Sequence, residues 1–150
     1  MDDLLDHLRR SFAGSYRVDE ELRGGGMSRL FLATDLALDR KVVVKILPPE
    51  LTSDMMSARY KRESEVTAHL QHPNILPIIT AGVRDGLMYY VMPFISGESL
   101  RVRLEREKQL PINDSVTILC EVASALSYAH KQGIIHRDIN EEARDLAHTI

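Results

Sequence analysis

The stretch Val42-Val43-Val44-Lys45-Ile46-Leu47 decides the fold class of this chain. Its apolar and mostly β-branched side chains favour a β-strand, and the prolines that follow at positions 48 and 49 end it. A lysine in such a strand either faces solvent or is buried, and a buried ammonium group is costly unless an anion meets it. Lys45 is therefore a candidate partner for an anionic group.

Four more strand-like stretches flank this one and predict a small, mostly antiparallel sheet. Three glycines separate the first two strands, and Arg84-Asp85-Gly86 has the composition of a hairpin turn between the last two. Residues 53–70 favour a helix, which ends at His72-Pro73 because the residue before a proline avoids the helical region. The expected strands are residues 16–22, 30–34, 42–47, 75–83 and 87–92.

Helices are expected before and after the sheet region. Residues 3–12 carry apolar side chains at helical spacing, and residues 99–108 favour a short charged helix. A longer helix is expected over residues 113–131, with Gly133 placed to end it. Its apolar face is expected to consist of Val116, Leu119, Cys120, Ala123 and Leu126.

An α+β fold class follows, with four expected parts. These are an N-terminal amphipathic helix (residues 1–15), a sheet lobe (16–95), a helical part (96–139) and a tail (140–150). The charge balance, with 19 basic and 22 acidic residues, does not point to nucleic acid. No apolar run approaches the roughly 20 residues that span a bilayer, so a cytoplasmic protein without a membrane segment is expected.

Three further features could carry chemistry, and each has a simpler reading. Glycines 24–26 could bring backbone N–H groups close to an anion, or form a flexible turn. Glu63, on the expected helix, could pair with Lys45, or be a solvated surface charge. Asp138, in His136-Arg137-Asp138, could accept a proton from a hydroxyl substrate, or belong to an ordinary polar loop.

The order and spacing of these features resemble the signature set of the protein kinases. Residues 22–30 resemble the glycine-rich loop, 42–45 the Val-Ala-Ile-Lys strand, and 60–63 the helix that supplies the glutamate. Residues 72–75 and 90–100 look like the loop after that helix and the hinge, and 136–139 like the start of the catalytic loop. The chain is identified as a member of the bacterial eukaryotic-like (Hanks-type) serine/threonine kinases over about residues 16–139.

The resemblance implies a protein-kinase-like N-lobe, a five-stranded antiparallel sheet with one inserted helix, followed by a partial helical C-lobe. It implies ATP as cofactor, Lys45 on the α- and β-phosphates and paired with Glu63, and Asp138 as the residue that takes the substrate proton. Pro93 would join the hinge. The residues implied at the ATP site are Leu22, Gly24, Gly25, Gly26, Met27, Leu30, Val43, Lys45, Met92, Phe94 and Ile95.

The sequence departs from the family pattern in the glycine-rich loop and after Ile139. Arg23 and Ser28 replace the first and third glycines, so a side chain at 23 restricts approach to a phosphate. Asn140 and Ala143 stand where the family has lysine and a metal-binding asparagine, and no Asp-Phe-Gly follows. Mg²⁺ is expected for the family, yet its protein ligands are absent here, so we expect no useful phosphoryl transfer by this chain alone.

Three functional readings remain open. The first is a serine/threonine kinase fragment that uses ATP and a protein substrate. The second is a truncated pseudokinase-like module that binds nucleotide or a protein partner. The third, a small-molecule antibiotic kinase, is disfavoured because those enzymes usually carry His-Gly-Asp in place of His136-Arg137-Asp138. With little of the helical lobe present, the apolar face of helix 113–131 should be partly exposed, which predicts self-association, a partner or poor solubility.

Overall fold

The computed structural model describes residues 3–22, 29–47, 65 and 67–135. The chain divides into two compact units. The first comprises residues 1–65 and 78–94, and the second comprises residues 66–77 and 95–150. Each unit has its own hydrophobic core.

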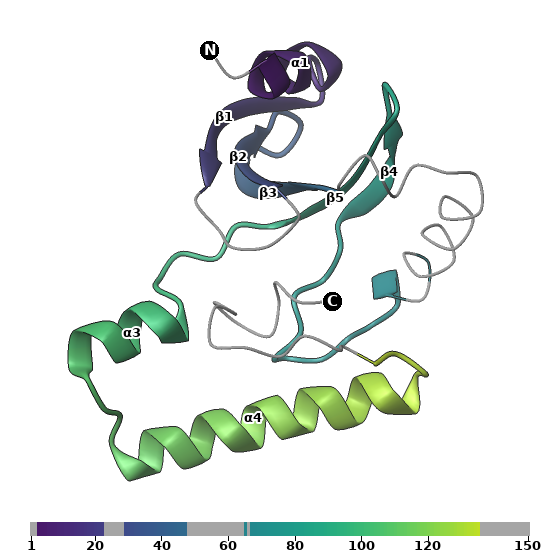
Figure 1. Cartoon of the computed structure of the whole chain (residues 1–150). Helices are drawn as coiled ribbons and strands as arrows, with labels where there is room; N and C mark the ends of the chain where they lie inside the picture. The colour runs from purple at the N-terminus through teal and green to yellow at the C-terminus, as the bar shows by residue number, and fades with distance from the viewer. Residues whose placement is uncertain (1–2, 23–28, 48–64, 66, 136–150) are drawn as a thin grey trace. The chain divides into compact units, whose positions relative to one another are not determined.

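The first unit is built on a five-stranded antiparallel sheet, as the sequence predicts, in the order β1-β2-β3-β5-β4 (Figure 1). Its last two strands form a hairpin whose turn residues, Asp85 and Gly86, have φ of 50° and 78°. Positive φ at both central residues is typical of the type I′ turn, which matches the twist of the flanking strands. The strands are β1 (Tyr16–Leu22), β2 (Arg29–Asp35), β3 (Arg40–Ile46), β4 (Thr80–Arg84) and β5 (Leu87–Pro93).

A β-bulge in β1 changes which side chains share a face. Val18 pairs with Ala33, but after the bulge at Asp19 the pairing shifts by one residue, so that Leu22 pairs with Leu30. Without the bulge, positions 18 and 22 would point to the same face, since side chains alternate along a strand. The bulge therefore sends Val18 to one face of the sheet and Leu22 to the other.

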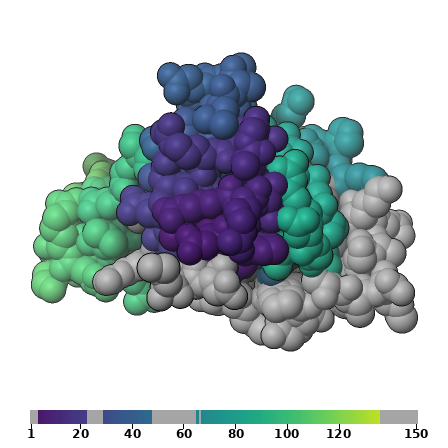
Figure 2. All heavy atoms as spheres, turned by 90° about the horizontal axis from the view of Figure 1, so that it is seen from above, coloured from purple at the N-terminus to yellow at the C-terminus, as the bar shows by residue number. Residues whose placement is uncertain are grey.

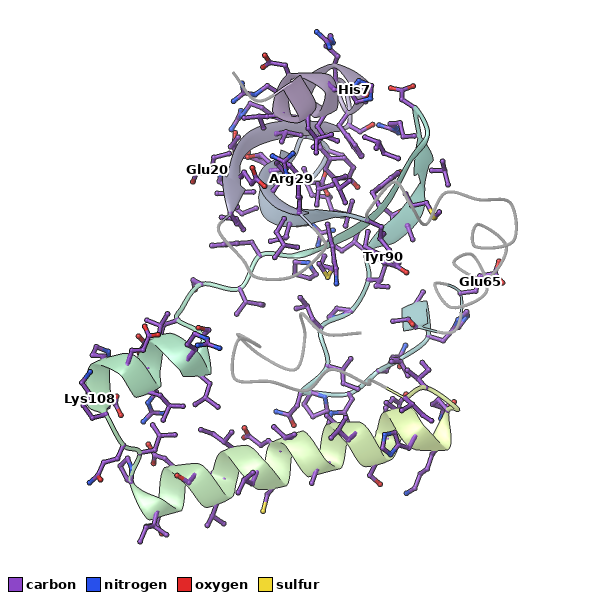
Figure 3. The ribbon with its side chains drawn as sticks, in the orientation of Figure 1. His7, Glu20, Arg29, Glu65, Tyr90 and Lys108 are labelled. Carbon is purple, nitrogen blue, oxygen red and sulfur yellow. The ribbon has the colours of Figure 1, made fainter. Side chains whose placement is uncertain are left out.

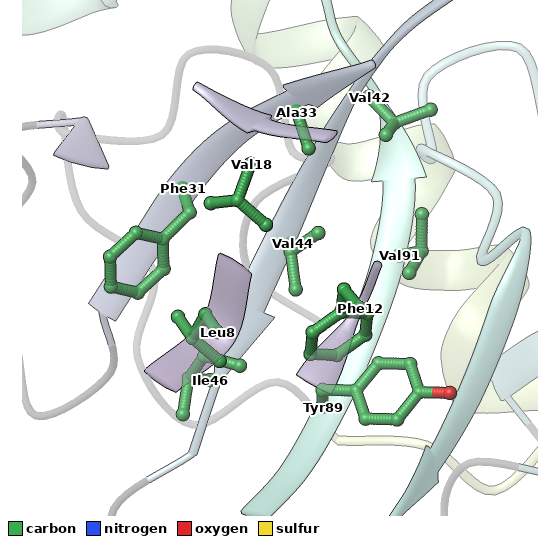
Figure 4. Packing of buried hydrophobic residues seen from close by; sticks show 10 residues of the cluster. All are labelled: Leu8, Phe12, Val18, Phe31, Ala33, Val42, Val44, Ile46, Tyr89 and Val91. Carbon is green, nitrogen blue, oxygen red and sulfur yellow. The ribbon is translucent and has the colours of Figure 1, made fainter. Parts of the chain in front are cut away.

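One face of the sheet is closed by α1 (Asp3–Ser11) and the residue that follows it. Leu8 and Phe12 are 0% exposed and pack into the same cluster as the alternate residues of the strands. Figure 4 shows the cluster, which consists of Leu8, Phe12, Val18, Phe31, Ala33, Val42, Val44, Ile46, Tyr89 and Val91. Residues 1–15, expected as a separate helical segment, thus supply part of the core of the sheet unit.

Polar contacts join α1 to β1 on one side and to the β4–β5 hairpin on the other. Arg9 donates to the main-chain oxygens of Val18 (3.2 Å) and Asp19 (2.9 Å) on β1. Arg84 donates to the Ser11 carbonyl (3.2 Å) and lies over the Phe12 ring at 4.9 Å, while the Ser11 hydroxyl donates to Asp85. Figure 2 shows the dark purple side chains of α1 directly beside those of the β4–β5 hairpin.

The second unit contains α3 (Leu100–Glu107) and α4 (Ile112–Lys131). The Ser99 hydroxyl accepts from the Val102 N–H at 3.3 Å and caps α3. At the end of α4, Gly133 has φ of 79° and the Ile134 N–H donates to the Ala129 carbonyl at 3.0 Å, which is the expected glycine stop. Both helices lie within one residue of their predicted bounds.

The apolar face predicted for α4 is largely exposed, as expected, and the helix packs through a different side. Ala125 and Ala129 are buried and Val122 packs beside them, against Leu70 and Ile75. The predicted face is largely outside: Val116 and Leu119 are 53% and 66% exposed, and Cys120 is also exposed. Because α4 carries apolar residues on more than one side, hydrophobic periodicity alone does not select the side that a partner covers.

The strand predicted over residues 75–83 is shorter than expected, since β4 begins at Thr80. The Ile75 N–H donates to the His72 carbonyl at 3.0 Å in a turn, and Pro77 has no N–H to give to a sheet. The Ile75 side chain packs in the core of the second unit. Most of the helix predicted over residues 53–70 lies outside the described residues, and residues 65, 67 and 68 are helical.

Candidate functional site

The candidate site lies on the face of the sheet opposite α1. Lys45 on β3 pairs with Leu30 on β2 and with Tyr90 on β5, and Leu30 pairs in turn with Leu22 on β1. Their strand neighbours, such as Val44 and Val91, belong to the core under α1. Since neighbouring residues of a strand point to opposite faces, this row of four side chains lies on the other face.

A second row continues the same face. Val43 pairs with Leu32 on one side and with Met92 on the other. Val43 and Met92 are buried, while Leu22, Leu30 and Leu32 are half-buried. Among the described residues, these two rows therefore form a largely apolar surface of leucine, valine and methionine in which Lys45 is the amine. Figure 3 shows the side chains on the ribbon, with Tyr90 labelled on β5.

Burial alone lowers the pKa of the Lys45 amine from its ordinary value. Within the described ranges, no acidic side chain forms an ion pair with Lys45 and no acceptor bonds to its amine. A partly desolvated ammonium group without an acidic neighbour favours an anionic ligand, because the anion restores the interactions lost on leaving water. An apolar surface beside this cation suits a ligand that has an apolar part and an anionic part.

The backbone at the end of β5 offers a restricted set of polar groups. The Phe94 N–H donates to the Lys41 carbonyl at 3.3 Å, and Pro93 has no N–H. Pro93 could therefore offer a ligand only its carbonyl oxygen, as a hydrogen-bond acceptor. Ile95, the next residue of the expected hinge, is 39% exposed and belongs to the second unit.

An ion-pair network occupies the same sheet face beyond Val43. Lys41 donates to Asp19 at 2.6 Å, Arg17 donates to Asp19 at 3.1 Å, and the Thr34 hydroxyl donates to Asp19 at 3.2 Å. The hydrogen bond from Lys41 is the largest cause of the lowered pKa of the Asp19 carboxyl. Lys41 is thus engaged by a carboxylate, in contrast to Lys45 four positions along the strand.

Several predicted site residues lie outside the described residues. These are Gly24, Gly25, Gly26, Met27, Glu63 and Asp138. Among the residues that are described, no group of three His, Cys, Asp or Glu side chains could hold a metal ion. The described part of the candidate site is therefore the sheet surface around Lys45, and the roles of Glu63 and Asp138 stay predictions.

Sequence reasoning missed two residues that share this surface. Tyr90 lies opposite Lys45, and Leu32 lies opposite Val43. A signal for both was present, because Leu32 is two positions after Leu30 and Tyr90 is two positions before Met92. The two-residue period of a strand places each of them on the same face as its predicted neighbour.

Comparisons with known proteins agree with the geometry. The protein kinase domain family matches residues 16–143. The chain is 37% identical over 142 residues to the serine/threonine-protein kinase pkn3 of Myxococcus xanthus, covering 93% of this chain and 26% of that protein. It is 40% identical over 129 residues to the serine/threonine-protein kinase PknJ of Mycobacterium tuberculosis, covering 85% of this chain and 22% of that protein.

A solved structure is similar over most of the chain. The crystal structure of the M. tuberculosis PknI kinase domain superposes with a TM-score of 0.77 at 29% sequence identity, covering 91% of this chain and 55% of that one. The chain therefore spans about a quarter of the length of the curated relatives it matches. No described helix is both long enough and apolar enough to cross a membrane.

Proposed function

The chain belongs to the protein kinase domain family, and from this premise we propose that its sheet unit binds ATP on the face that carries Lys45. The observation that supports this is the half-buried amine of Lys45, set in an apolar surface without an acidic neighbour among the described residues. We also propose that this site is related by descent to the ATP site of serine/threonine kinases, since the relatives are named serine/threonine-protein kinases.

Each residue on the face has a role in this proposal. Leu22, Leu30 and Val43 cover the adenine ring, with Met92 at the back. Once ATP is bound, Lys45 holds the α- and β-phosphates and pairs with Glu63, which orients it, while glycines 24–26 and Met27 cover the phosphates. At the hinge, the Pro93 carbonyl accepts a hydrogen bond from the adenine edge, with Phe94 and Ile95 beside it.

Phosphoryl transfer by this chain alone is not part of the proposal. Asp138 would orient a substrate hydroxyl and accept its proton, which typically contributes about 10²–10⁴-fold to a rate. Magnesium would neutralise developing charge when bound. Ala143 has no side-chain oxygen to hold that ion where the family has asparagine. We therefore propose a pseudokinase-like nucleotide-binding module in place of an active phosphotransferase, with a cytoplasmic location, where ATP is available.

Two lysines of the same strand provide a matched test of nucleotide binding. Lys45 and Lys41 lie two rows apart on one face of β3, but only Lys41 is paired with a carboxylate. We expect Lys45→Met to weaken binding of a fluorescent ATP analogue at least tenfold, and Lys41→Met to change it less than about twofold, since surface ion pairs contribute little. Equal losses in both variants, or no binding by the parent chain, would refute the proposal.

A phosphoryl-transfer assay distinguishes a nucleotide-binding module from an active kinase. With magnesium, ATP and a generic protein substrate, the chain should show no turnover above the Lys45→Met and Asp138→Asn variants. Turnover that exceeds both variants would establish a working kinase and overturn the proposed lack of transfer, while leaving nucleotide binding intact.

A protein contact through α4 is proposed as the second activity of the chain. Its exposed apolar residues, among them Ile112 and Leu119, form a surface of the kind that marks protein contacts. We propose self-association of the chain through this helix as the form of that contact.

A further inference from the structure

A forked ion pair joins the end of β1 to the beginning of β2. The two carboxylate oxygens of Glu21 accept hydrogen bonds from the Arg29 guanidinium, one from Nε at 2.7 Å and one from Nη2 at 2.6 Å. The same guanidinium lies over the Phe31 ring, 5.4 Å from its centroid. Two parallel bonds and a stacked ring define the orientation of a planar guanidinium, which a single surface contact does not.

The ion pair lies on the face of the sheet that α1 covers. Glu21 pairs with Phe31 in the register of β1 and β2, and Phe31 belongs to the core under α1. Arg29 comes two residues before Phe31 and therefore shares its face. Leu22 and Leu30, the next residue of each strand, lie opposite each other on the other face, which is the face of the candidate site.

The bulge at Asp19 separates two registers of β1 on β2, and three residue pairs follow it. If the register of Val18 continued past Asp19 instead, every later side chain of β1 would turn to the opposite face, because a slip of one residue exchanges the two faces of a strand. Leu22 would then lie on the α1 face, and the Glu21 carboxylate would take its place on the face of the candidate site. The bulged register is thus the one that brings Leu22 to that site.

The ion pair is compatible with only one of these registers. In the bulged register Glu21 and Arg29 lie on the same face, diagonally across from each other. In the continuous register Arg29 would keep its face, because β2 is also paired with β3, while Glu21 would point to the other side of the sheet. The two charged groups could not bond there. A cross-strand ion pair stabilises the pairing in which it forms, so this one favours the bulged register.

We infer that Glu21 and Arg29 are positioning residues for the candidate site, because their ion pair selects the register that places Leu22 beside Leu30 on the face of Lys45. Both residues act from the opposite face of the sheet, through the position of Leu22. The effect on ligand binding rests on the proposed nucleotide site, whereas the selection of the register does not depend on any ligand.

Charge reversal separates this role from a direct effect of charge on an anionic ligand. Arg29→Glu places two carboxylates near each other and Glu21→Arg places two guanidinium groups near each other, so either change disfavours the bulged register. Each should weaken binding of the fluorescent ATP analogue about threefold or more, although the two variants change the net charge in opposite directions. A direct charge effect would instead weaken binding in the first variant and strengthen it in the second.

Two further variants are the controls. The double reversal, Glu21→Arg with Arg29→Glu, restores an opposite-charge pair at the parent net charge and should bind the ATP analogue within about twofold of the parent chain. Arg40→Glu places a like charge beside Asp35 at the other end of β2, where no second register is at stake. It should also stay within about twofold of the parent chain.

Nuclear magnetic resonance of the ligand-free chain reports the register directly. Contacts between backbone protons of Leu22 and Leu30 should be present in the parent chain, the double reversal and Arg40→Glu, and weakened in both single reversals. Opposite changes in nucleotide binding for the two single reversals, unchanged contacts in both, or a double reversal that recovers neither measurement would each overturn the inference. If the parent chain binds no nucleotide, the proposed function fails, while the Leu22–Leu30 contacts still decide whether the ion pair selects the register.

Discussion

The ring of Phe12 meets the ring of Tyr89 edge-on, with centroids 4.8 Å apart and planes inclined by 87°. Phe12 follows the last residue of α1, and Tyr89 lies on β5, so this contact ties the beginning of the chain to a central strand. The protein kinase domain family matches from residue 16 onward. The contact therefore shows that residues outside the family match are part of the sheet unit's core.

Phe12→Ala should destabilise the sheet unit strongly. The ring is 0% exposed and packs in the core with Tyr89 and Val91. Truncating a buried phenylalanine typically costs about 3–5 kcal/mol, through lost burial and the cavity left behind. Urea unfolding followed by circular dichroism would measure this loss. Leu38→Ala, at a leucine that is 63% exposed in a turn, should change stability by less than about 0.5 kcal/mol. A similar effect of the two variants would contradict the packing described.

Lys45→Met should raise the free energy of unfolding of the ligand-free chain. Burial lowers the pKa of the Lys45 amine, so the folded state disfavours the charged form relative to the unfolded state. The unfolded chain then binds more protons between the folded pKa and the ordinary pKa near 10.5, and parent stability rises with pH across that window. Methionine removes the penalty at neutral pH, a gain of about 1 kcal/mol.

Denaturant titrations at neutral pH and near pH 10 would check this. The Lys45→Met chain should lack the rise in stability with pH that this amine gives the parent. Loss of stability in the variant at neutral pH would show that Lys45 has a stabilising partner, and that its burial is compensated within the folded chain.

Asp19→Asn should reduce the loss of unfolding free energy that the parent chain shows as pH falls through the acidic range. The hydrogen bond from Lys41, with contributions from Arg17 and Thr34, lowers the pKa of the Asp19 carboxyl. A lowered folded pKa means that stability is present above the unfolded value of 3.8 and is lost as pH falls toward the folded value. Because Lys41 is 49% exposed, the loss at neutral pH should not exceed about 1 kcal/mol. Asp39→Asn, at an exposed turn position, is the control, and an equal response to acid in both variants would count against the network.

Tyr128→Phe should remove one hydrogen bond from the second unit while keeping its packing. The Tyr128 hydroxyl accepts from the Gln71 N–H at 3.0 Å, and the Tyr128 ring lies 5.4 Å from the His72 ring. Losing the acceptor should cost about 1 kcal/mol. Hydrogen exchange should show faster exchange at the Gln71 amide with unchanged protection in the strands of the first unit. Unaltered exchange at Gln71 would refute the bond.

The sheet and the helices α3 and α4 were predictable because their signals are local. The β-branched run through Val44 predicts β3, Asp85-Gly86 predicts the last hairpin, and Gly133 predicts the end of α4. The glycine-strand-lysine order then indicates the family, and with it the candidate site residues on one face of the sheet. Lys45, Leu30 and Leu22 do share that face in the structure.

The remaining features depend on contacts between distant segments, which no local pattern reports. Nothing in the residues around Asp19 indicates a bulge, yet the bulge decides that Leu22 lies with Leu30 and apart from Val18. Ile75 has the side chain of a strand residue, but its partners are Ala125 and Ala129 on α4. The amphipathic pattern of residues 3–12 predicts a helix without saying which surface it covers.

The core of the second unit has a consequence for the order in which the chain folds during synthesis. Leu70 and Ile75 have their partners on α4 and at Ile134, and the Gln71–Tyr128 bond joins residues 57 positions apart. The β1–β2 and β2–β3 pairings join neighbouring segments, so they can form early, as local contacts generally do. During synthesis, residues 67–77 instead remain unpacked, with their apolar side chains exposed, until α4 has been translated.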